Sequence, residues 1–216
     1  SKAARKALRA SALPSFDLSI ILPMPRRLIL ASITLACGLA LPGTAPAQVR
    51  TDTQADEVIV QMQQAFRRGD RNRLAALLPQ ARGHVLEPWA AYWEARNRLE
   101  EFTAADMDAF SARYPGSYQE DRLRNDWLLL LGQRRDWTTF ASEHPRYRMH
   151  DDREVRCYAL LVEQISSGQP ASTAAVDEVR KNWLAQRDAD DGCTQAADRL
   201  IAARRLPPED AWRRAR

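Results

Sequence analysis

Apolar residues recur every three or four positions along most of this chain, and that spacing is the feature that most restricts its fold. The clearest stripes lie within residues 58–66, 74–78, 123–131, 155–165, 176–184 and 193–201. Such a spacing places the side chains on one face of an α-helix, whereas a half-buried strand alternates every second residue. No stretch of the sequence shows a sustained period of two. The sequence therefore predicts an all-α protein.

Glycine and proline divide the stripes into short segments. We expect all six glycines after residue 47 to lie between helices, because glycine inside a helix costs about 1 kcal/mol. These are Gly69, Gly83, Gly116, Gly132, Gly168 and Gly192. The candidate N-caps are Thr103, in a capping-box pattern with Asp106, and Asp136, Ser172 and Asp191. We predict about nine or ten helices of roughly 8 to 17 residues, stacked as hairpins in a superhelical solenoid.

Residues 24–47 have the pattern of a secretory signal peptide. Arg26 and Arg27 precede an apolar run over 28–41, and a cleavage pattern follows at Ala45-Pro46-Ala47. The run is shorter than the roughly 20 residues of a transmembrane helix, so we expect no stable membrane insertion after cleavage. Residues 1–23 precede the signal and are interpreted as a mis-started or non-native leader. The pattern predicts export to the periplasm.

The net charge of +4 comes from this leader. Residues 1–47 hold six basic groups and one acidic group, which leaves 26 basic and 27 acidic residues in 48–216. Because the body of the chain is nearly neutral, its charge gives no indication that it binds nucleic acid.

The cysteines indicate one disulfide. Cys37 lies in the apolar run and resembles a lipoprotein acceptor, but Thr34 stands where an aliphatic residue is usual, so anchoring there is the weaker alternative. Cys157 and Cys193 then remain in an exported chain, where an even number predicts a pair. Two buried free thiols are the other interpretation.

Few residue patterns indicate catalysis. The acidic pairs at 100–101, 151–152 and 190–191 are adjacent residues, which do not face each other on a helix, and the last two pairs open predicted helices, where carboxylates act as caps. The histidines, His84, His144 and His150, lack the spacing of a helical metal site. The sequence has no phosphate-loop, His-Glu-x-x-His or Gly-x-Ser-x-Gly pattern. We expect no catalytic residue, metal site or cofactor in this chain.

Tryptophan is the residue that most suggests ligand contact. Sugar rings stack on exposed indoles, and the six tryptophans are Trp89, Trp93, Trp127, Trp137, Trp183 and Trp212. Trp89 with Trp93 and Trp127 with Leu131 keep the four-residue spacing of a helix core. Core packing is therefore favoured over a sugar site.

Several segments, in their order and spacing, carry a resemblance to a known family. They are Phe66-Arg67-Arg68-Gly69-Asp70 with Leu74 to Pro79, Leu86 to Trp89 with Tyr92-Trp93, Arg122 to Trp127 with Arg135-Asp136-Trp137, Val155 to Tyr158, and Asn182-Trp183-Leu184 before Cys193. Over roughly residues 50–216 the chain resembles the N-terminal superhelical region of the soluble lytic murein transglycosylases.

The resemblance implies a ring or horseshoe of helices ahead of a lysozyme-like domain that cleaves the bond after N-acetylmuramic acid without hydrolysis. The family's catalytic glutamate is followed by serine, and no glutamate here is. We therefore expect residues 48–216 to be the truncated, inactive N-terminal scaffold of a longer enzyme. Its partners would be peptidoglycan glycan strands and cell-wall synthesis proteins. The alternative is a free-standing periplasmic helical-repeat module that binds proteins.

Overall fold

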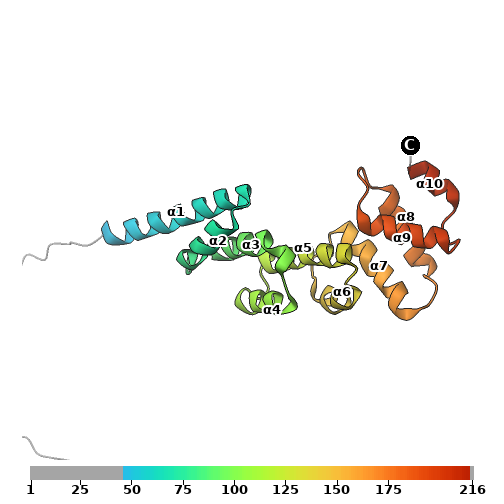
Figure 1. Cartoon of the computed structure of the whole chain (residues 1–216), viewed down its shortest axis with the longest axis horizontal. Coiled ribbons are helices and arrows are strands. Elements are labelled where there is room, and N and C mark those ends of the chain that lie inside the picture. The colour runs from blue at the N-terminus through green and yellow to red at the C-terminus, as the bar shows by residue number, and fades with distance from the viewer. Residues whose placement is uncertain (1–45, 215–216) are drawn as a thin grey trace, which may run out of the picture. The chain divides into compact units, whose positions relative to one another are not determined.

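The structure, a computed structural model, describes residues 46–214, with side chains from residue 53 onward. These residues are all-helical and contain no strand, which confirms the predicted all-α class (Figure 1). The α-helices are α1 (Pro46–Arg68), α2 (Arg71–Leu77), α3 (Glu87–Asn97), α4 (Ala104–Arg113), α5 (Tyr118–Arg134), α6 (Trp137–Glu143), α7 (Arg153–Ser167), α8 (Thr173–Leu184), α9 (Asp191–Ala202) and α10 (Pro208–Arg214). The predicted leader and nearly all of the predicted signal peptide, Cys37 included, fall on residues 1–45, outside the described range.

Helix lengths differ from the prediction at both extremes. Helix α1 has 23 residues, and α2, α6 and α10 have seven each. Both α2 and α6 continue directly into a 3-10 turn, η1 (Leu78–Ala81) and η3 (His144–Arg146), each with a proline in its first positions. Proline lacks the N–H that an α-helix needs at that point, so the α-helix ends there and a tighter turn follows. A third 3-10 turn, η2 (Leu99–Glu101), follows α3.

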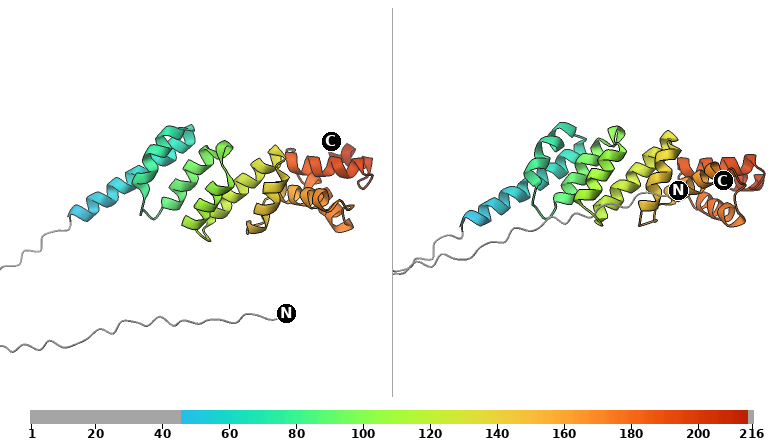
Figure 2. Two further views of the ribbon diagram at one scale, coloured as in Figure 1. Left: turned by 60° about the horizontal axis from the view of Figure 1, so that its bottom comes forward. Right: turned by 90° about the horizontal axis from the view of Figure 1, so that it is seen from below.

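The helices pack mainly on near neighbours in the chain. Within 46–214, the principal pairs are α1 with α2 and α3, α2 with α3, α3 with α5, α5 with α4, α6, α7 and α9, α6 with α7, α7 with α8 and α9, α8 with α9, and α8 with α10. Figure 2 shows the same succession from two further directions. This order of packing is what a stacked array requires. The superhelical solenoid itself stays a prediction.

Three clusters of buried apolar side chains fill the spaces between these helices. The first joins α1, α2 and α3 around Met62 and Leu74. The second, which is the largest, extends from α3 to α7 around Trp127. The third joins α7 to α10 and contains Cys157 and Cys193. Among the described helices, none combines the length and apolar character that crossing a membrane requires.

The expectation that glycines lie between helices is wrong at two positions. Gly132 lies inside α5 and Gly192 inside α9, whereas the other four lie in turns. A Cβ atom on Gly132 would lie 2.4 Å from the ring of Tyr158, and one on Gly192 would lie 2.8 Å from the backbone oxygen of Glu154. Because α7 approaches both helices so closely, only glycine fits at these two contacts.

Most of the predicted helix caps are confirmed. Thr103 and Asp106 form the complete capping box, and the side chains of Asp136 and Ser172 accept from backbone N–H groups of α6 and α8. The prediction of Asp191 as a cap is wrong. Asp190 is the N-cap of α9, and Asp191 is the first helical residue. Carboxylates are favoured at both positions, because the N-terminal end of a helix carries unpaired N–H groups. The N-cap differs from the first helical residue only in its non-helical backbone angles.

Candidate binding site

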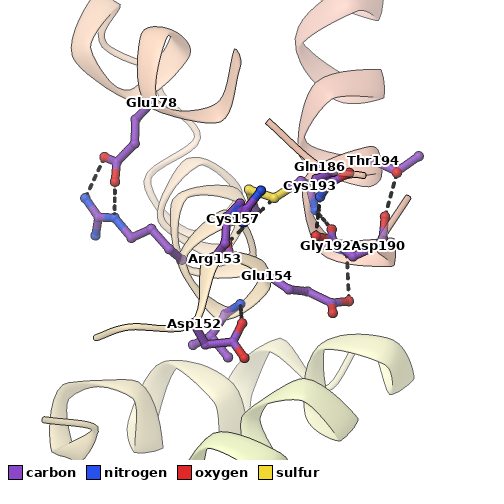
Figure 3. The surroundings of a disulfide bond; sticks show 12 residues. Asp152, Arg153, Glu154, Cys157, Glu178, Gln186, Asp190, Gly192, Cys193 and Thr194 are labelled. Atoms are coloured by element: carbon purple, nitrogen blue, oxygen red, sulfur yellow. Dashed lines mark hydrogen bonds and ion pairs between the residues drawn. A yellow bond between two sulfur atoms is a disulfide. The ribbon is translucent and has the colours of Figure 1, made fainter. Parts of the chain in front are cut away.

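The predicted disulfide between Cys157 and Cys193 is present and joins α7 to α9 (Figure 3). The two Cα atoms are 4.9 Å apart, and both residues are fully buried. Their surroundings are apolar side chains of α7, α8 and α9, Trp183 among them. The pair is therefore a crosslink inside a core, and the alternative of two free thiols is wrong.

Tyr158 connects three helices beside this crosslink. Its ring lies against Gly132 of α5, and its hydroxyl donates to Asp191 at the start of α9. Asp191 also accepts two hydrogen bonds from Arg135, at 2.6 and 3.1 Å. The bonds from Arg135 and from Tyr158 lower the pKa of Asp191 against the effect of its partial burial. The site is thus a structural junction.

Two other carboxylates cap the start of α9, although burial disfavours their charged form. The Asp190 carboxylate accepts from Cys193 N at 2.7 Å, and the Glu154 carboxylate accepts from Gly192 N at 3.2 Å (Figure 3). Burial raises the pKa of both groups, and the negative charge of Asp152 adds to the effect. Asp152 is itself the N-cap of α7. The acidic pairs at 151–152 and 190–191 therefore take part in capping, as the sequence predicts.

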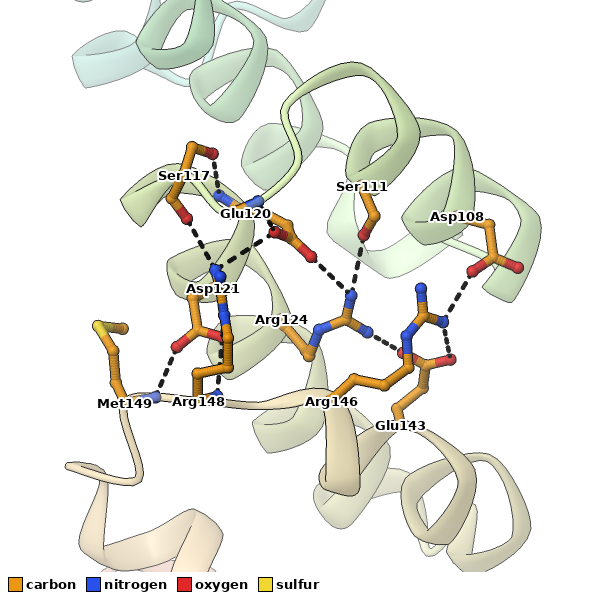
Figure 4. Close-up of polar contacts among 11 residues, drawn as sticks. Asp108, Ser111, Ser117, Glu120, Asp121, Arg124, Glu143, Arg146, Arg148 and Met149 are labelled. Carbon is orange, nitrogen blue, oxygen red and sulfur yellow. Dashed lines mark hydrogen bonds and ion pairs between the residues drawn. The ribbon is translucent and has the colours of Figure 1, made fainter.

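A buried arginine holds α4, α5 and α6 together (Figure 4). The guanidinium of Arg124 is fully buried in α5 and donates to Glu143 of α6, to Ser111 of α4 at 2.8 Å and to Glu120 at 3.2 Å. Arg146 reaches the same Glu143 carboxylate from the protein surface, at 3.2 Å. Within the described residues, only the Nε of Arg124 and the Oδ1 of Asn125 are buried side-chain polar atoms without a hydrogen-bond partner. Sequence analysis missed this network, although charged residues inside the 123–131 stripe signal it.

A carboxylate near the start of α5 fixes the segment that follows η3. Asp121 is almost fully buried and accepts from Arg148 N at 2.9 Å and Met149 N at 2.8 Å (Figure 4). These bonds satisfy two backbone N–H groups that belong to no helix. The segment between α6 and α7 is thereby attached to α5.

An aromatic groove of about 560 Å³ lies between α1 and α3. It is lined by Ile59, Val60, Gln63, Leu86, Trp89 and Trp93. Trp89 and Trp93 are one turn apart, with ring centroids separated by 6.3 Å, and the ring of Tyr118 lies 5.8 Å from Trp89 on the other side. Tyr118 is 54% exposed. The groove therefore has two half-buried indoles in its lining and an exposed phenol ring beside it.

The tryptophans follow the core prediction only in part. Trp127 and Trp183 are buried, and Trp137 is half-buried against the large cluster around Trp127. Trp89 and Trp93 pack against the core at one edge and line the groove at the other. Trp212 is 71% exposed on α10. Helical spacing predicts which indoles face the core, but it does not predict how much of each indole is exposed to solvent.

A smaller cleft of about 270 Å³ is lined by α3, α4 and the segments beside them. At one end, Arg113 and Tyr114 both donate to Glu87, which also accepts from Gly83 N at 2.7 Å. Burial alone would raise the pKa of Glu87, but these hydrogen bonds outweigh it and lower the pKa. At the other end, Arg98 pairs with Glu94 and Asp106, each at 3.0 Å. Sequence analysis singled out only Asp106 among these charged residues, and as part of a helix cap.

The histidines have separate structural contacts. His84 accepts from Leu86 N at 3.0 Å through Nδ1, and its Nε2 lies 2.8 Å from Asp56 of α1. His144 stacks on Phe140, and its pKa is lowered by burial and by the nearby His150 and Arg156. In the part of the chain that the structure describes, no group of three or more His, Cys, Asp or Glu side chains could hold a metal ion.

We found no match for this chain among protein-family models, curated proteins or solved structures.

Proposed function

We propose that this chain is the N-terminal scaffold of a periplasmic lytic transglycosylase, and that it binds peptidoglycan while a separate domain performs the cleavage. The proposal is supported by the resemblance of residues 50–216 to that family, by the all-α fold and by a disulfide that suits an oxidising compartment. The signal-peptide pattern of residues 24–47 supports the periplasm as the compartment.

The observation that carries the scaffold role is where the resemblance residues lie. Trp127 of α5, Tyr158 of α7 and Trp183 of α8 are all buried between helices. These three residues of the resemblance are therefore packing residues, which hold one helix against the next. Such a set suits a framework, and the chemistry of the family belongs to a glutamate-serine pair that this sequence lacks.

We assign the contact with glycan strands to the groove between α1 and α3. Sugar rings bind proteins by stacking their apolar faces on aromatic side chains. Trp89 and Trp93 line the groove, and the ring of Tyr118 lies beside it, 5.8 Å from that of Trp89. Ring stacking needs no charged partner. This suits a groove whose remaining lining is mostly aliphatic.

Co-sedimentation with purified murein sacculi tests the proposal. The exported, purified chain should sediment with sacculi without releasing anhydromuropeptides. Trp89→Ala combined with Tyr118→Ala should reduce the sedimented fraction severalfold, whereas Trp212→Ala, which removes an exposed indole elsewhere, should leave it unchanged. Equal loss in both variants, or no sedimentation of the unaltered chain, would contradict the proposal. So would release of anhydromuropeptides that a single Glu→Gln change abolishes.

The alternative, a periplasmic module that binds other proteins, is favoured by one observation. Val60 and Leu86, which line the groove, are 46% and 40% exposed, and exposed apolar side chains gathered in one place mark sites that bind other proteins. The gene distinguishes the two functions. A reading frame that continues for a few hundred codons to a Glu-Ser motif supports the transglycosylase, and a stop codon directly after Arg216 supports the binding module.

A further inference from the structure

The cleft beside α3 and α4 has opposite charge at its two ends. The first end holds Arg82, Arg113 and Glu87, because the hydrogen bond from Gly83 N to Glu87 places the Arg82–Gly83 segment there. These three groups sum to one positive charge. The second end holds one guanidinium, Arg98, between the carboxylates of Glu94 and Asp106, which sum to one negative charge.

The positive end has donors to spare. Among the described residues, Arg82 has no hydrogen bond or ion pair, although it lines the cleft and is exposed. Arg113 uses its Nε and Nη2 atoms for Glu87, which leaves its Nη1 donors. Both Glu87 oxygens already accept, from Arg113, Tyr114 and Gly83. A ligand at this end therefore meets guanidinium N–H groups, which match a carboxylate in geometry and in charge.

The space between the two ends is apolar and small. Its walls include Ala91 and Ala95 of α3 and Ala109 of α4, with Phe102 and Phe110 beside them. The alanines leave the volume open, since larger side chains there would fill it. A volume of about 270 Å³ lies just below the range of about 300–1,000 Å³ in which drug-sized ligands bind. The cleft suits a ligand of one or two amino-acid residues with small side chains.

We propose that this cleft binds a short zwitterionic peptide, with its terminal carboxylate on Arg82 and Arg113. Its terminal ammonium lies near the net negative charge of Glu94 and Asp106, whose oxygens also accept from Arg98 and Thr103. The ligand's charges complement the charges of the two ends, and its small side chains contact Phe102 and Phe110. The inference does not rest on the function proposed above, which involves the groove between α1 and α3. Sacculus binding and peptide binding can therefore fail separately.

Calorimetric titration of the exported, purified chain with alanylalanine tests the proposal. Binding should weaken about tenfold or more when the peptide's carboxylate is replaced by an amide, because a charge-assisted pair is lost. N-acetylation of the peptide should also weaken binding, since it removes the ammonium group. The L,L and D,D forms of the dipeptide distinguish a protein C-terminus from a cell-wall peptide, and tighter binding of either form supports the cleft.

Variants locate the binding within the cleft. Arg82→Gln should weaken the free dipeptide about tenfold and leave the weak binding of its amide unchanged, because only the carboxylate contacts this residue. Ala109→Phe, a change at an exposed position, should block binding by filling the cleft. Arg68→Gln, an exposed arginine outside the cleft, is the matched control and should have no effect. Equal binding of acid and amide, unaltered binding in Arg82→Gln, or no binding at millimolar dipeptide would overturn the proposal.

Discussion

Two arginines that donate to one carboxylate show how strongly burial sets the value of an ion pair. Arg124 is fully buried and Arg146 has a side chain that is 43% exposed, yet both donate to Glu143. We expect Arg124→Ala to lower the free energy of unfolding by about 3 kcal/mol, because it leaves a buried carboxylate without its main partner. Arg146→Ala should cost less than about 1 kcal/mol, as exposed pairs do. Urea denaturation of both variants measures the difference, and similar losses would contradict this explanation.

Glu154 and Asp191 should affect stability in opposite directions as pH changes. Burial raises the pKa of Glu154, so the folded state holds that proton more tightly, and the stability it contributes at low pH is lost as pH rises through the folded-state pKa. The bonds from Arg135 and Tyr158 lower the pKa of Asp191, so its contribution is present at neutral pH and is lost as pH falls through the folded-state pKa.

Amide variants separate the two effects. The free energy of unfolding of Glu154→Gln, compared with that of the unaltered chain, should be more favourable at pH 7 than at pH 4. The reason is that the variant lacks a carboxylate that is costly to ionise in the folded state. Asp191→Asn should be destabilising at pH 7, and this destabilisation should shrink as pH falls through the lowered folded-state pKa of Asp191. Thermal unfolding over pH 3 to 7 measures both profiles. Parallel profiles for the two variants would show that the assigned causes are wrong.

At the scale of helices, the close approach of α7 to α5 depends on Gly132. We expect Gly132→Ala to destabilise the fold by about 2 kcal/mol, since the new methyl group would overlap the Tyr158 ring and force the helices apart. The penalty should shrink when Tyr158 is also changed to Ala, because the overlapping ring is then gone. Denaturant unfolding of the four variants of this cycle measures the coupling. An unchanged penalty in the double variant would rule out the overlap as the cause.

The same glycine shows where sequence reasoning succeeds and where it stops. Spacing predicts the all-α class, because a helical stripe depends only on residues near one another in the chain. The low helix propensity of glycine, a property of the residue itself, predicts a turn at Gly132. The ring that requires glycine there belongs to Tyr158, 26 positions later in the chain. Hydrophobic spacing likewise cannot predict the cleft at Arg82 and Glu87, because the residues that line it come from separate segments. The cysteines were predictable because pairing in an exported chain needs only their number.

The disulfide should be the largest single contribution to holding α7 and α9 together. Replacing both cysteines with alanine should lower the free energy of unfolding by about 4 kcal/mol, the loop-closure value for an interval of 36 residues. Denaturation of the unaltered chain with and without reductant should show a similar difference, and the double-alanine variant should not respond to reductant. A response of the variant to reductant would assign the effect to something other than this bond.

At the scale of all the described helices, α10 should be one of the least stable. Helix α10 packs mainly on α8 and is attached to it by the ion pair of Asp210 with Arg180, at 2.5 Å. Because α10 contacts few of the described helices whereas α7 packs on α5, α8 and α9, we expect amides of α10 to exchange faster than those of α7. Asp210→Asn should speed exchange in α10 further and leave α7 unchanged. Hydrogen exchange resolved by peptide measures both, and equal protection of α10 and α7 would contradict the expectation.

The crosslink between α7 and α9 also makes a closed covalent ring, because the backbone from Cys157 to Cys193 and the disulfide together form a loop that contains the whole of α8. A single cut by a protease in either turn beside α8, at 168–172 or 185–190, opens this ring without separating the pieces. Both ends of the cut stay attached through the disulfide, and the packed core of α7, α8 and α9 holds them near each other. The chain can therefore be nicked at these exposed turns and remain one molecule until a reductant releases the pieces.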